Sequence, residues 1–333
     1  MKAMVLDQVG PIEASPLRLM DVACPEPAPG EVRVRVEACG VCHTDLHEVE
    51  GELPLPKRPV IPGHQVVGQV AALGDGVNGV RVGQWVGLAW LAGTCGRCEF
   101  CRCERENLCA AARFTGYHRD GGYAEYVLAE ADYVYALPGG VSAAAAAPLL
   151  CAGIIGYRAL RLSNIEPGGR LGLYGFGASA HITLQIARHW GCEVYVFSRS
   201  GEHRRLAERL GAVWTGPAEE KPPRPLHASV IFAPAGNLAP VALEHLDRGG
   251  TCVLAGITMS QIPPLDYEKH LYYEKVLRSV TASTRRDGRE LLELAGRIGI
   301  RTEVEAYELA QANQALQRLK SGQVNGAAVL RMA

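Results

Sequence analysis

The stretch RLGLYGFGASA, residues 170–180, decides how the second half of this chain folds. Its residues 171–174 form a short apolar run typical of a buried strand, and the glycines that follow mark a tight turn. A helical pattern covers residues 180–190, and a second apolar run at 193–197 predicts the next strand. A strand, a turn, a helix and a strand in this order predict a βαβ unit with parallel strands.

The alternation of strands and helices continues downstream of this unit. Further strands are expected at residues 230–232 and 252–255, and further helices at 203–210 and 239–246. A chain that alternates in this way predicts an α/β fold with a doubly wound parallel sheet.

The glycine-rich turn is also a candidate binding site. It lies where a strand ends and a helix begins, which is the context of the dinucleotide-binding fingerprint. Glycine allows a ligand to approach the backbone closely, and the free N–H groups of the first helical turn attract phosphate. We therefore expect Gly175, Gly177, Ala178 and Ser179 to hold the pyrophosphate of a dinucleotide.

The end of the second strand indicates which dinucleotide binds. An Asp or Glu at this point would accept hydrogen bonds from the ribose 2′-hydroxyl and would repel a 2′-phosphate. This chain has Ser198 and Arg199 instead, with His203 just beyond. Because a hydroxyl and a guanidinium suit a phosphate, the sequence favours NADP, with NAD as the alternative.

The first third of the chain has a different pattern, with short β-segments separated by Gly and Pro. Residues 31–37 alternate strictly between apolar and charged side chains, and residues 66–70 and 85–89 predict further strands. After residue 284 the order is helix, strand, helix and strand. Periodicity alone leaves open whether these last elements extend the parallel sheet or return to the first domain.

Composition excludes several classes of protein. The 333 residues suffice for two domains, and the 34 basic and 35 acidic residues nearly cancel, so no charge excess points to nucleic acid or an anionic membrane. No purely apolar run reaches the roughly 18 residues of a membrane span. The first seven residues include the charged Lys2 and Asp7, where a signal peptide would be apolar. We expect a cytoplasmic protein that binds neither nucleic acid nor a membrane.

Four cysteines at short spacing predict a metal site. Cys95, Cys98, Cys101 and Cys109 can surround one Zn²⁺ tetrahedrally, because two-residue spacers let the chain fold back around the ion. Four sulfurs leave no open coordination position, so this zinc would be structural. Disulfides and an iron–sulfur cluster are the alternatives that the spacing leaves open. Cys103 falls outside the spacing and is interpreted as a spare thiol.

A second, more scattered group also offers metal ligands. Cys42, His64 and Cys151 each lie close to a glycine or to the end of the β-rich portion. Two Cys and one His would leave zinc one open position, which is the arrangement of catalytic sites. Spacing alone supports this grouping only weakly, because a buried Cys is usually a small hydrophobic residue.

Together these motifs resemble the zinc-dependent alcohol dehydrogenases of the medium-chain dehydrogenase/reductase superfamily, over essentially the whole chain. The matching segments are GVCHTDLH (40–47), PGH (62–64), the four cysteines at 95–109, DGGYAEY (120–126) and the glycine-rich turn at 175–180.

The resemblance implies a domain organisation. It implies a GroES-like, β-rich catalytic domain at residues 1–151 and a Rossmann cofactor-binding domain at 152–284, with a C-terminal return to the catalytic domain at 285–333. It also implies two zinc ions per subunit, one held by the four cysteines and a catalytic one held by Cys42, His64 and Cys151.

The resemblance further implies a mechanism. An alcohol would bind zinc at its open position and lose its proton, and the zinc-bound alkoxide would pass hydride to the nicotinamide. Thr44 would accept the proton and pass it through the nicotinamide ribose to His47. Asp45 would orient the zinc-bound imidazole, and His43 would lie near the pyrophosphate. Interpreted without the resemblance, Thr44 is a capping hydroxyl and His47 a surface imidazole.

Substrate and cofactor contacts follow from the same resemblance. Trp90 and Leu53 would line a narrow apolar pocket suited to primary or small secondary alcohols and to aldehydes. Expected cofactor contacts besides those named above are Ile155, Ala255 and Ile257. Three positions depart from the family pattern. Many members have Glu at the position of Gln65, Thr at that of Ile155 and Arg at that of Ala327.

Two other functions compete with alcohol dehydrogenation. One is a zinc-free quinone or enoyl reductase on the same fold, and the other is a non-catalytic nucleotide-binding protein. The retained Cys, His and Cys ligands argue against the first, and the presence of Thr44 and His47 argues against the second. The resemblance favours a homotetramer, with a dimer as the alternative.

Overall fold

A computed structural model describes residues 1–332 of the chain. The chain divides into two compact units, which are described separately. Unit 1 comprises residues 1–151, 282–297 and 301–333, and unit 2 comprises residues 152–281 and 298–300.

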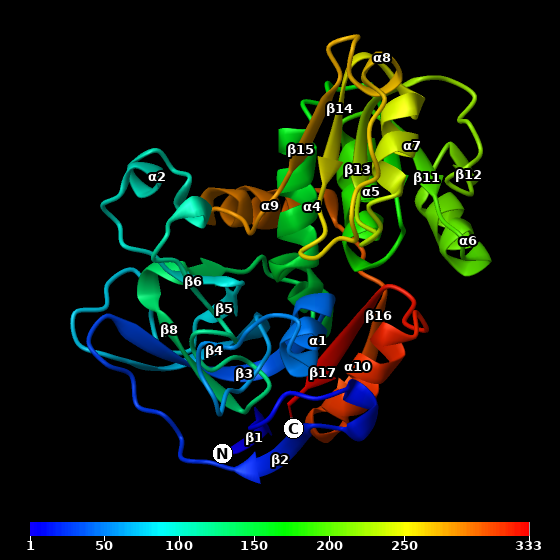
Figure 1. Cartoon of the computed structure of the whole chain (residues 1–333). Helices are drawn as coiled ribbons and strands as arrows, with labels where there is room; N and C mark the ends of the chain where they lie inside the picture. Colours follow the sequence, from blue (N-terminus) through cyan, green and yellow to red (C-terminus); the bar gives the residue numbers. More distant parts are fainter. Residues whose placement is uncertain (333) are drawn as a thin grey trace. The chain divides into compact units, whose positions relative to one another are not determined.

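Unit 2 contains a six-stranded parallel sheet, which confirms the predicted doubly wound α/β fold. The strands run across the sheet in the order β12 (Trp214–Gly216), β11 (Glu193–Phe197), β10 (Arg170–Tyr174), β13 (Leu226–Ile231), β14 (Leu246–Leu254) and β15 (Val276–Ser279). Numbered within the unit, this is the order 3-2-1-4-5-6 of the Rossmann fold. Figure 1 shows β13, β14 and β15 side by side.

Helices connect these strands. They are α4 (Ala152–Leu162), α5 (Ala178–His189), α6 (Gly201–Leu210), α7 (Leu238–His245) and α8 (Tyr267–His270). Because parallel crossovers are right-handed, α5 and α6 cover one face of the sheet and α7 covers the other. The central strands are buried on both faces, which explains their continuous apolar runs.

Two strands of this sheet escape prediction from the sequence. β12 has only three residues, and β15 lies at the edge of the sheet with three of its four residues exposed. Both strands are short, and neither alternates between buried and exposed residues. Their sequences therefore show no period-two pattern.

Unit 1 contains a seven-stranded sheet that is largely antiparallel. The main path runs through β16 (Val304–Glu308), β17 (Ala327–Arg331), β3 (Glu31–Val41), β4 (Gln65–Leu73), β5 (Trp85–Leu88) and β9 (Val134–Ala136), and β8 (Tyr126–Glu130) also pairs with β3. The alternating residues of β3 place Val32, Val34 and Val36 in the core, as their period predicts.

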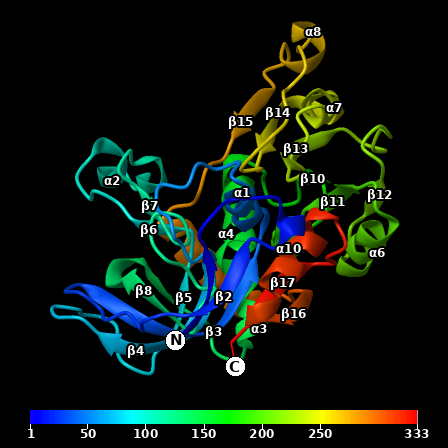
Figure 2. The same cartoon turned by 60° about the horizontal axis from the view of Figure 1, so that its bottom comes forward.

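The last part of the chain belongs to unit 1. β17 pairs antiparallel with β3, so that Leu330 lies opposite Cys39 and Ala328 opposite Val41. Figure 2 shows the C-terminal strand, in red, beside β3. The helix α10 (Ala312–Lys320), between β16 and β17, packs against α1 (His43–Glu50). The four elements after residue 284 therefore do not extend the parallel sheet of unit 2.

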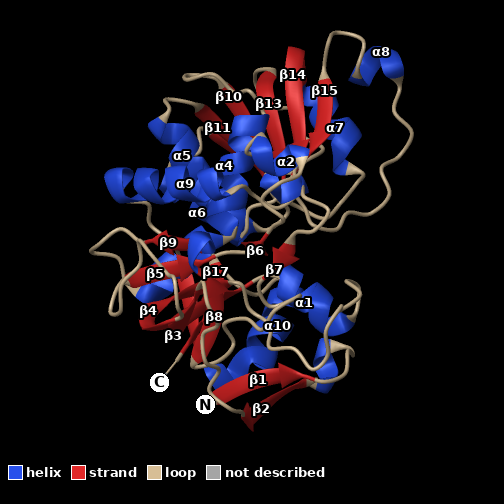
Figure 3. Ribbon diagram, turned by 90° about the vertical axis from the view of Figure 1, so that its left-hand side faces the viewer, coloured by secondary structure: helices blue, strands red, loops and turns tan. Residues whose placement is uncertain are grey.

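The remaining elements complete unit 1, and Figure 3 shows two of them, β1 and β2, as a separate ribbon. The remaining strands are β1 (Lys2–Leu6), β2 (Leu17–Asp21), β6 (Leu91–Gly93) and β7 (Arg113–Phe114), and the remaining α-helices are α2 (Glu99–Arg102), α3 (Ala143–Ala146) and α9 (Arg285–Ile298). The 3-10 helices are η1 (Ile12–Ala14), η2 (Glu106–Leu108), η3 (Ala131–Tyr133), η4 (Ala147–Leu150) and η5 (Leu309–Gln311).

One segment has the length and mean hydropathy of a membrane span, although the sequence shows no uninterrupted apolar run of that length. Ala143–Leu162 reaches a mean hydropathy of 1.5, and 67% of its most apolar window is buried inside the protein. The segment consists of three successive elements, α3, η4 and α4. Its apolar side chains pack in the protein core, which favours apolar residues as a bilayer does.

Candidate active site

Cys42 is held at the junction between β3 and α1 by hydrogen bonds within four residues. Its side chain accepts a hydrogen bond from the backbone N–H of Thr44 at 3.3 Å. Its own backbone N–H donates to Oδ2 of Asp45 at 2.8 Å. This reciprocal pattern is a capping box, with Cys42 as the N-cap of α1. The helix start therefore fixes the position of the thiol.

His64 is placed by a tight turn before β4. The preceding Gly63 has a φ of +97°, and a Cβ at that position would lie 2.3 Å from Cδ1 of Tyr123. Only glycine fits there. The imidazole is fully buried, and its Nε2 lies 3.4 Å from Sγ of Cys42. Cys151, which follows η4, completes the group, and the three ligand atoms lie within 4.8 Å of one another.

Asp45 sets the direction in which the imidazole faces. Its Oδ1 lies 3.0 Å from Nδ1 of His64, which leaves Nε2 directed at Cys42. Burial disfavours the charged imidazole, but the neighbouring Asp45 and Cys42 outweigh this effect and raise the pKa of His64 well above its usual value. A carboxylate behind a ligating imidazole is a common feature of metal sites.

The donor set fits zinc. The hydrogen bond that the Cys42 thiol donates to Cys151, together with burial, raises the pKa of Cys42 well above that of a free thiol. A cation that compensates the negative charge therefore favours loss of the Cys42 proton. Two sulfurs and one nitrogen are the ligands of a catalytic zinc site, with the fourth position open.

The four-cysteine loop forms a second metal site. Cys95, Cys98, Cys101 and Cys109 place their sulfurs within 4.8 Å of one another, and those of Cys98 and Cys101 are 3.5 Å apart. The backbone N–H groups of Arg97 and Cys98 lower the pKa of Cys95 to about 6, which favours its thiolate. This closed tetrahedral donor set is that of structural zinc. Cys103 is exposed and lies outside the set, as the spacing predicts.

The two expected proton-relay side chains lie on the first turns of α1. Thr44 is buried beside the Cys42 thiol, and His47 is half-buried one turn further along the helix. The Nδ1 atom of His47 forms a short contact with the carboxylate of Glu52, a partner that the sequence does not indicate. His43 is exposed at the start of the helix, with its ring 6.4 Å from that of His47.

Aromatic side chains pack against the metal site. The Trp90 ring meets the His64 ring edge-on at 4.9 Å, and it stacks on Phe114 at 4.8 Å. The Tyr117 ring lies 5.8 Å from Trp90, and its hydroxyl donates to the carbonyl of Pro54 at 2.7 Å. Phe114 and Tyr117 lie far from Trp90 in the sequence, so no local pattern points to them.

Leu53 lies next to Pro54 and is half-buried, and its N–H donates to the carbonyl of His47. Of the two expected pocket residues, Trp90, in the β5–β6 connection, contacts the metal-site residue His64, whereas Leu53, after α1, is linked by its backbone to His47.

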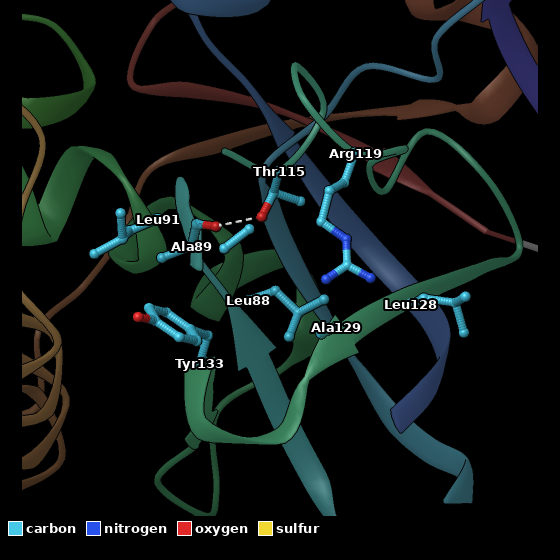
Figure 4. Close-up of a pocket in the computed structure, with 9 residues that line it drawn as sticks. Leu88, Ala89, Leu91, Thr115, Arg119, Leu128, Ala129 and Tyr133 are labelled. Atoms are coloured by element: carbon cyan, nitrogen blue, oxygen red, sulfur yellow. Dashed lines mark hydrogen bonds between the residues drawn. The ribbon is translucent and has the colours of Figure 1, made fainter. Parts of the chain in front are cut away.

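A small internal cavity elsewhere in unit 1 plays no part in this site. It measures about 10 Å³, close to the minimum for a single water molecule. Figure 4 shows the hydroxyl of Thr115 directed at the carbonyl of Ala89, at a distance of 2.8 Å. The lining residues are Leu88, Ala89, Leu91, Ala92, Thr115, Arg119, Leu128, Ala129 and Tyr133. The cavity is a packing gap.

In unit 2 the glycine-rich turn has the backbone required for a dinucleotide. Gly175 has a φ of +85°, and a Cβ there would lie 3.0 Å from the backbone N of Ala233. Gly177 has open space where a side chain would be, which allows a ligand to approach the backbone. Helix α5 begins at Ala178, followed by Ser179, so its free N–H groups adjoin this space.

The residues expected around the adenosine ribose lie after β11. Arg199 is exposed, and Ser198 is buried with its carbonyl accepting a hydrogen bond from Arg204 at 2.7 Å. His203 lies in the first turn of α6, where its N–H donates to the hydroxyl of Ser200. Arg204 therefore supports this loop, a role that the sequence does not reveal.

The other expected cofactor contacts are dispersed. Ala255 and Ile257 follow β14, Ile155 is half-buried on α4, and Ala327 starts β17 in unit 1 and is buried.

Comparisons with known proteins agree with both units. Residues 28–139 match the family described as the alcohol dehydrogenase GroES-like domain, and residues 178–297 match the zinc-binding dehydrogenase family. The chain is 48% identical to a probable alcohol dehydrogenase, AdhA, of Mycobacterium tuberculosis, over 99% of this chain and 97% of that protein. It is 38% identical to an alcohol dehydrogenase of Geobacillus stearothermophilus over the full length of both.

A solved structure of an alcohol dehydrogenase is also similar to this chain. A cobalt- and zinc-bound thermostable alcohol dehydrogenase from Pyrobaculum aerophilum superposes with a TM-score of 0.91 at 26% identity, covering 99% of both chains.

Proposed function

The chain belongs to the zinc-containing alcohol dehydrogenase family of the medium-chain dehydrogenase/reductase superfamily, and from that premise we propose the finer points of its reaction. The protein is a zinc-dependent alcohol dehydrogenase that uses a nicotinamide cofactor. We propose primary or small secondary alcohols, and the corresponding aldehydes, as its substrates, and NADP rather than NAD as its preferred cofactor.

One observation carries the proposed chemistry: Cys42, His64 and Cys151 meet within 4.8 Å and offer three of the four ligands of a tetrahedral ion. Zinc bound there supplies a Lewis acid that lowers the pKa of an alcohol oxygen, and the nicotinamide accepts the hydride. The protein positions both reactants.

Thr44 and His47 are proposed to move the proton. The buried Thr44 hydroxyl lies next to the Cys42 thiol on α1 and would accept the alcohol proton. His47 is partly exposed, with 14% of its side chain open to solvent, and would release that proton to water. The Glu52 carboxylate fixes one imidazole nitrogen of His47 and favours the proton-accepting state of the other.

Substrate size is proposed to be limited by Trp90 and Leu53. The Trp90 ring is held in place by its contacts with His64, Phe114 and Tyr117, so it cannot easily swing away from the metal site. A rigid apolar wall favours small, unbranched alcohols, although hydrophobic pockets distinguish chain lengths by only about 1–3 kcal/mol per methylene.

The cofactor preference is proposed to come from Ser198, Arg199 and His203. The exposed guanidinium of Arg199 follows β11, and no carboxylate occupies residues 198–201 to repel a 2′-phosphate. We also propose that the enzyme is cytoplasmic and a homotetramer, with a dimer as the alternative, which sedimentation velocity can decide.

Turnover with each cofactor tests the proposal. The purified protein is expected to contain two zinc ions per subunit and to oxidise small alcohols with a higher kcat/KM for NADP⁺ than for NAD⁺. Arg199→Ala is expected to lower kcat/KM for NADP⁺ roughly tenfold or more while leaving that for NAD⁺ nearly unchanged, because a charge-assisted hydrogen bond to phosphate is lost. An equal effect on both cofactors would contradict the assignment of Arg199, and one zinc without alcohol turnover would favour a non-catalytic protein.

A further inference from the structure

A buried carboxyl group near the metal site has no part in the reaction described so far. Glu48 lies on α1, three residues after Asp45 and four after Thr44, so the three side chains share one face of the helix. The side chains of Asp45 and Glu48 are both fully buried. Within residues 1–332, neither carboxylate oxygen of Glu48 has a hydrogen-bond partner.

Such a group needs a partner. Buried carboxylates are almost always hydrogen-bonded, paired with a cation or bound to a metal, because removal from water is otherwise uncompensated. The charged groups that act on Glu48 are Asp45, His64 and Cys42. Two of these three are ligands of the zinc site, so the unpartnered carboxyl belongs to the surroundings of the metal.

A second electrostatic interaction relates Glu48 to the aromatic side chains of the site. Its charge acts on Tyr117, whose ring packs beside Trp90, and Trp90 meets the His64 ring. Glu48 is therefore near the metal ligands and also near the aromatic side chains that line the site.

The other polar groups at the site are neutral or already engaged. Asp45 accepts the N–H of Cys42 and faces Nδ1 of His64. Gln65, beside the zinc ligand His64, is neutral, and its side chain lies against β3, where a Cβ on Gly40 would be 2.8 Å from Cδ of Gln65. Glu48 is thus the carboxyl at this site that remains available.

We propose that the carboxyl group of Glu48 supports the catalytic zinc site through one bridging water, because its oxygens are not among the ligand atoms that lie within 4.8 Å of one another. The cation compensates the buried negative charge, and the carboxylate in turn strengthens metal binding. This role rests on the metal site alone and not on the proton relay or the cofactor preference.

Glu48→Gln tests this role, since it keeps the size of the side chain and removes its charge. Metal affinity at the Cys42/His64/Cys151 site is measured by competition of Co²⁺ and Zn²⁺ with a chelator, without alcohol or cofactor. We expect the affinity to fall about 10–100-fold, the range found when a carboxylate supporting a metal site is removed. Affinity at the four-cysteine site serves as the internal reference and is expected not to change.

Glu50→Gln is the matched control. Glu50 lies on the same helix, but its carboxylate accepts the N–H of Ile12 and pairs with Lys320, away from the metal ligands. This variant is expected to bind metal as the original protein does. Glu48→Asp, which keeps the charge one methylene further back, is expected to recover part of the affinity that Glu48→Gln loses.

The visible spectrum of the cobalt-loaded protein tests the bridging water. In Glu48→Gln we expect weaker affinity with an unchanged spectrum, because the three ligands stay the same, and a spectral change would indicate a direct bond and contradict the bridging role. Unchanged metal affinity in a folded Glu48→Gln variant would overturn the proposal and leave Glu48 as a protonated core residue. Because neither substrate is present, that outcome would leave the assignment of the alcohol reaction intact.

Discussion

Two residues beside the metal site are fixed by different local interactions. The Cys42 thiol is fixed by the capping box of α1, which involves only Thr44 and Asp45. The His64 imidazole is fixed by a left-handed glycine before it and by a carboxylate from another element behind it. The first arrangement lies within a four-residue segment, whereas the second requires the turn after residue 60 to meet α1.

Gly63→Ala is expected to disturb the metal site through the backbone. Its φ of +97° costs a non-glycine residue about 1–3 kcal/mol, and the added methyl would collide with the Tyr123 ring. We expect a lower Tm and a loss of zinc from the Cys42 site. Gly76→Ala is the control, because Gly76 has a φ of +76° but open space around it. Equal effects of the two substitutions would show that the ring contact has no importance.

His47→Gln is expected to slow alcohol oxidation about 10²-fold in kcat at neutral pH, the lower range of a general acid–base contribution. A small imidazole buffer is expected to restore part of the lost rate, because it can carry the proton in place of the side chain. His189→Gln, at the exposed end of α5, is the control and should leave kcat unchanged. A variant at position 47 with full activity would exclude His47 from the proton path.

At the scale of elements, some helices and strands are identified by the pattern of their own residues, whereas others depend on pairing with a neighbouring strand. β10, the turn and α5 follow one another in sequence, and their order alone identifies them. β12 and β15 form only because a neighbouring strand is already in place, and their own residues carry little signal. Helix α7 illustrates the packing: its His245 lies against the stacked rings of Tyr174 and Phe197.

His245 is expected to make folding stability depend on pH. Burial lowers its pKa below the usual 6.5, and its Nδ1 lies 2.8 Å from the hydroxyl of Tyr174. The unfolded chain therefore binds a proton as pH falls through 6.5, before the folded protein does, and stability is lost in that window. We expect His245→Gln to lose less stability between pH 7 and pH 5, measured by denaturant unfolding. Parallel pH profiles for the two proteins would be inconsistent with this prediction.

At the scale of the whole molecule, the C-terminal segment closes unit 1. β17 lies between β16 and β3, and α10 contributes the fully buried Ala315 and Leu316 to the same core as Val34 and Leu330. Residues more than 280 positions apart thereby share one sheet, as in the pairing of Ala328 with Val41.

Deletion of residues 301–333 is expected to prevent unit 1 from folding, because one edge of β3 would lose its partner and the core would lose α10. The truncated protein should bind no zinc at the Cys42 site and should aggregate. Adding residues 301–333 as a separate peptide is expected to restore metal binding in part. A truncated chain that remains folded with both zinc sites filled would refute this view.

The sequence by itself determined the parallel α/β unit, the nucleotide turn and the four-cysteine site, because each depends on neighbouring residues and on periodicities that short segments carry. The resemblance to a family supplied the Cys42, His64 and Cys151 grouping, which spacing supported only weakly. The relay, pocket and cofactor residues stay predictions.

Only the tertiary structure decided that the last elements join unit 1, that Glu52 faces His47, that Tyr117 packs on Trp90 and that Glu48 is buried without a partner. These contacts join segments that are distant along the chain or depend on which helix face is covered. They arise from the packing of complete elements, which a local pattern of residues does not predict.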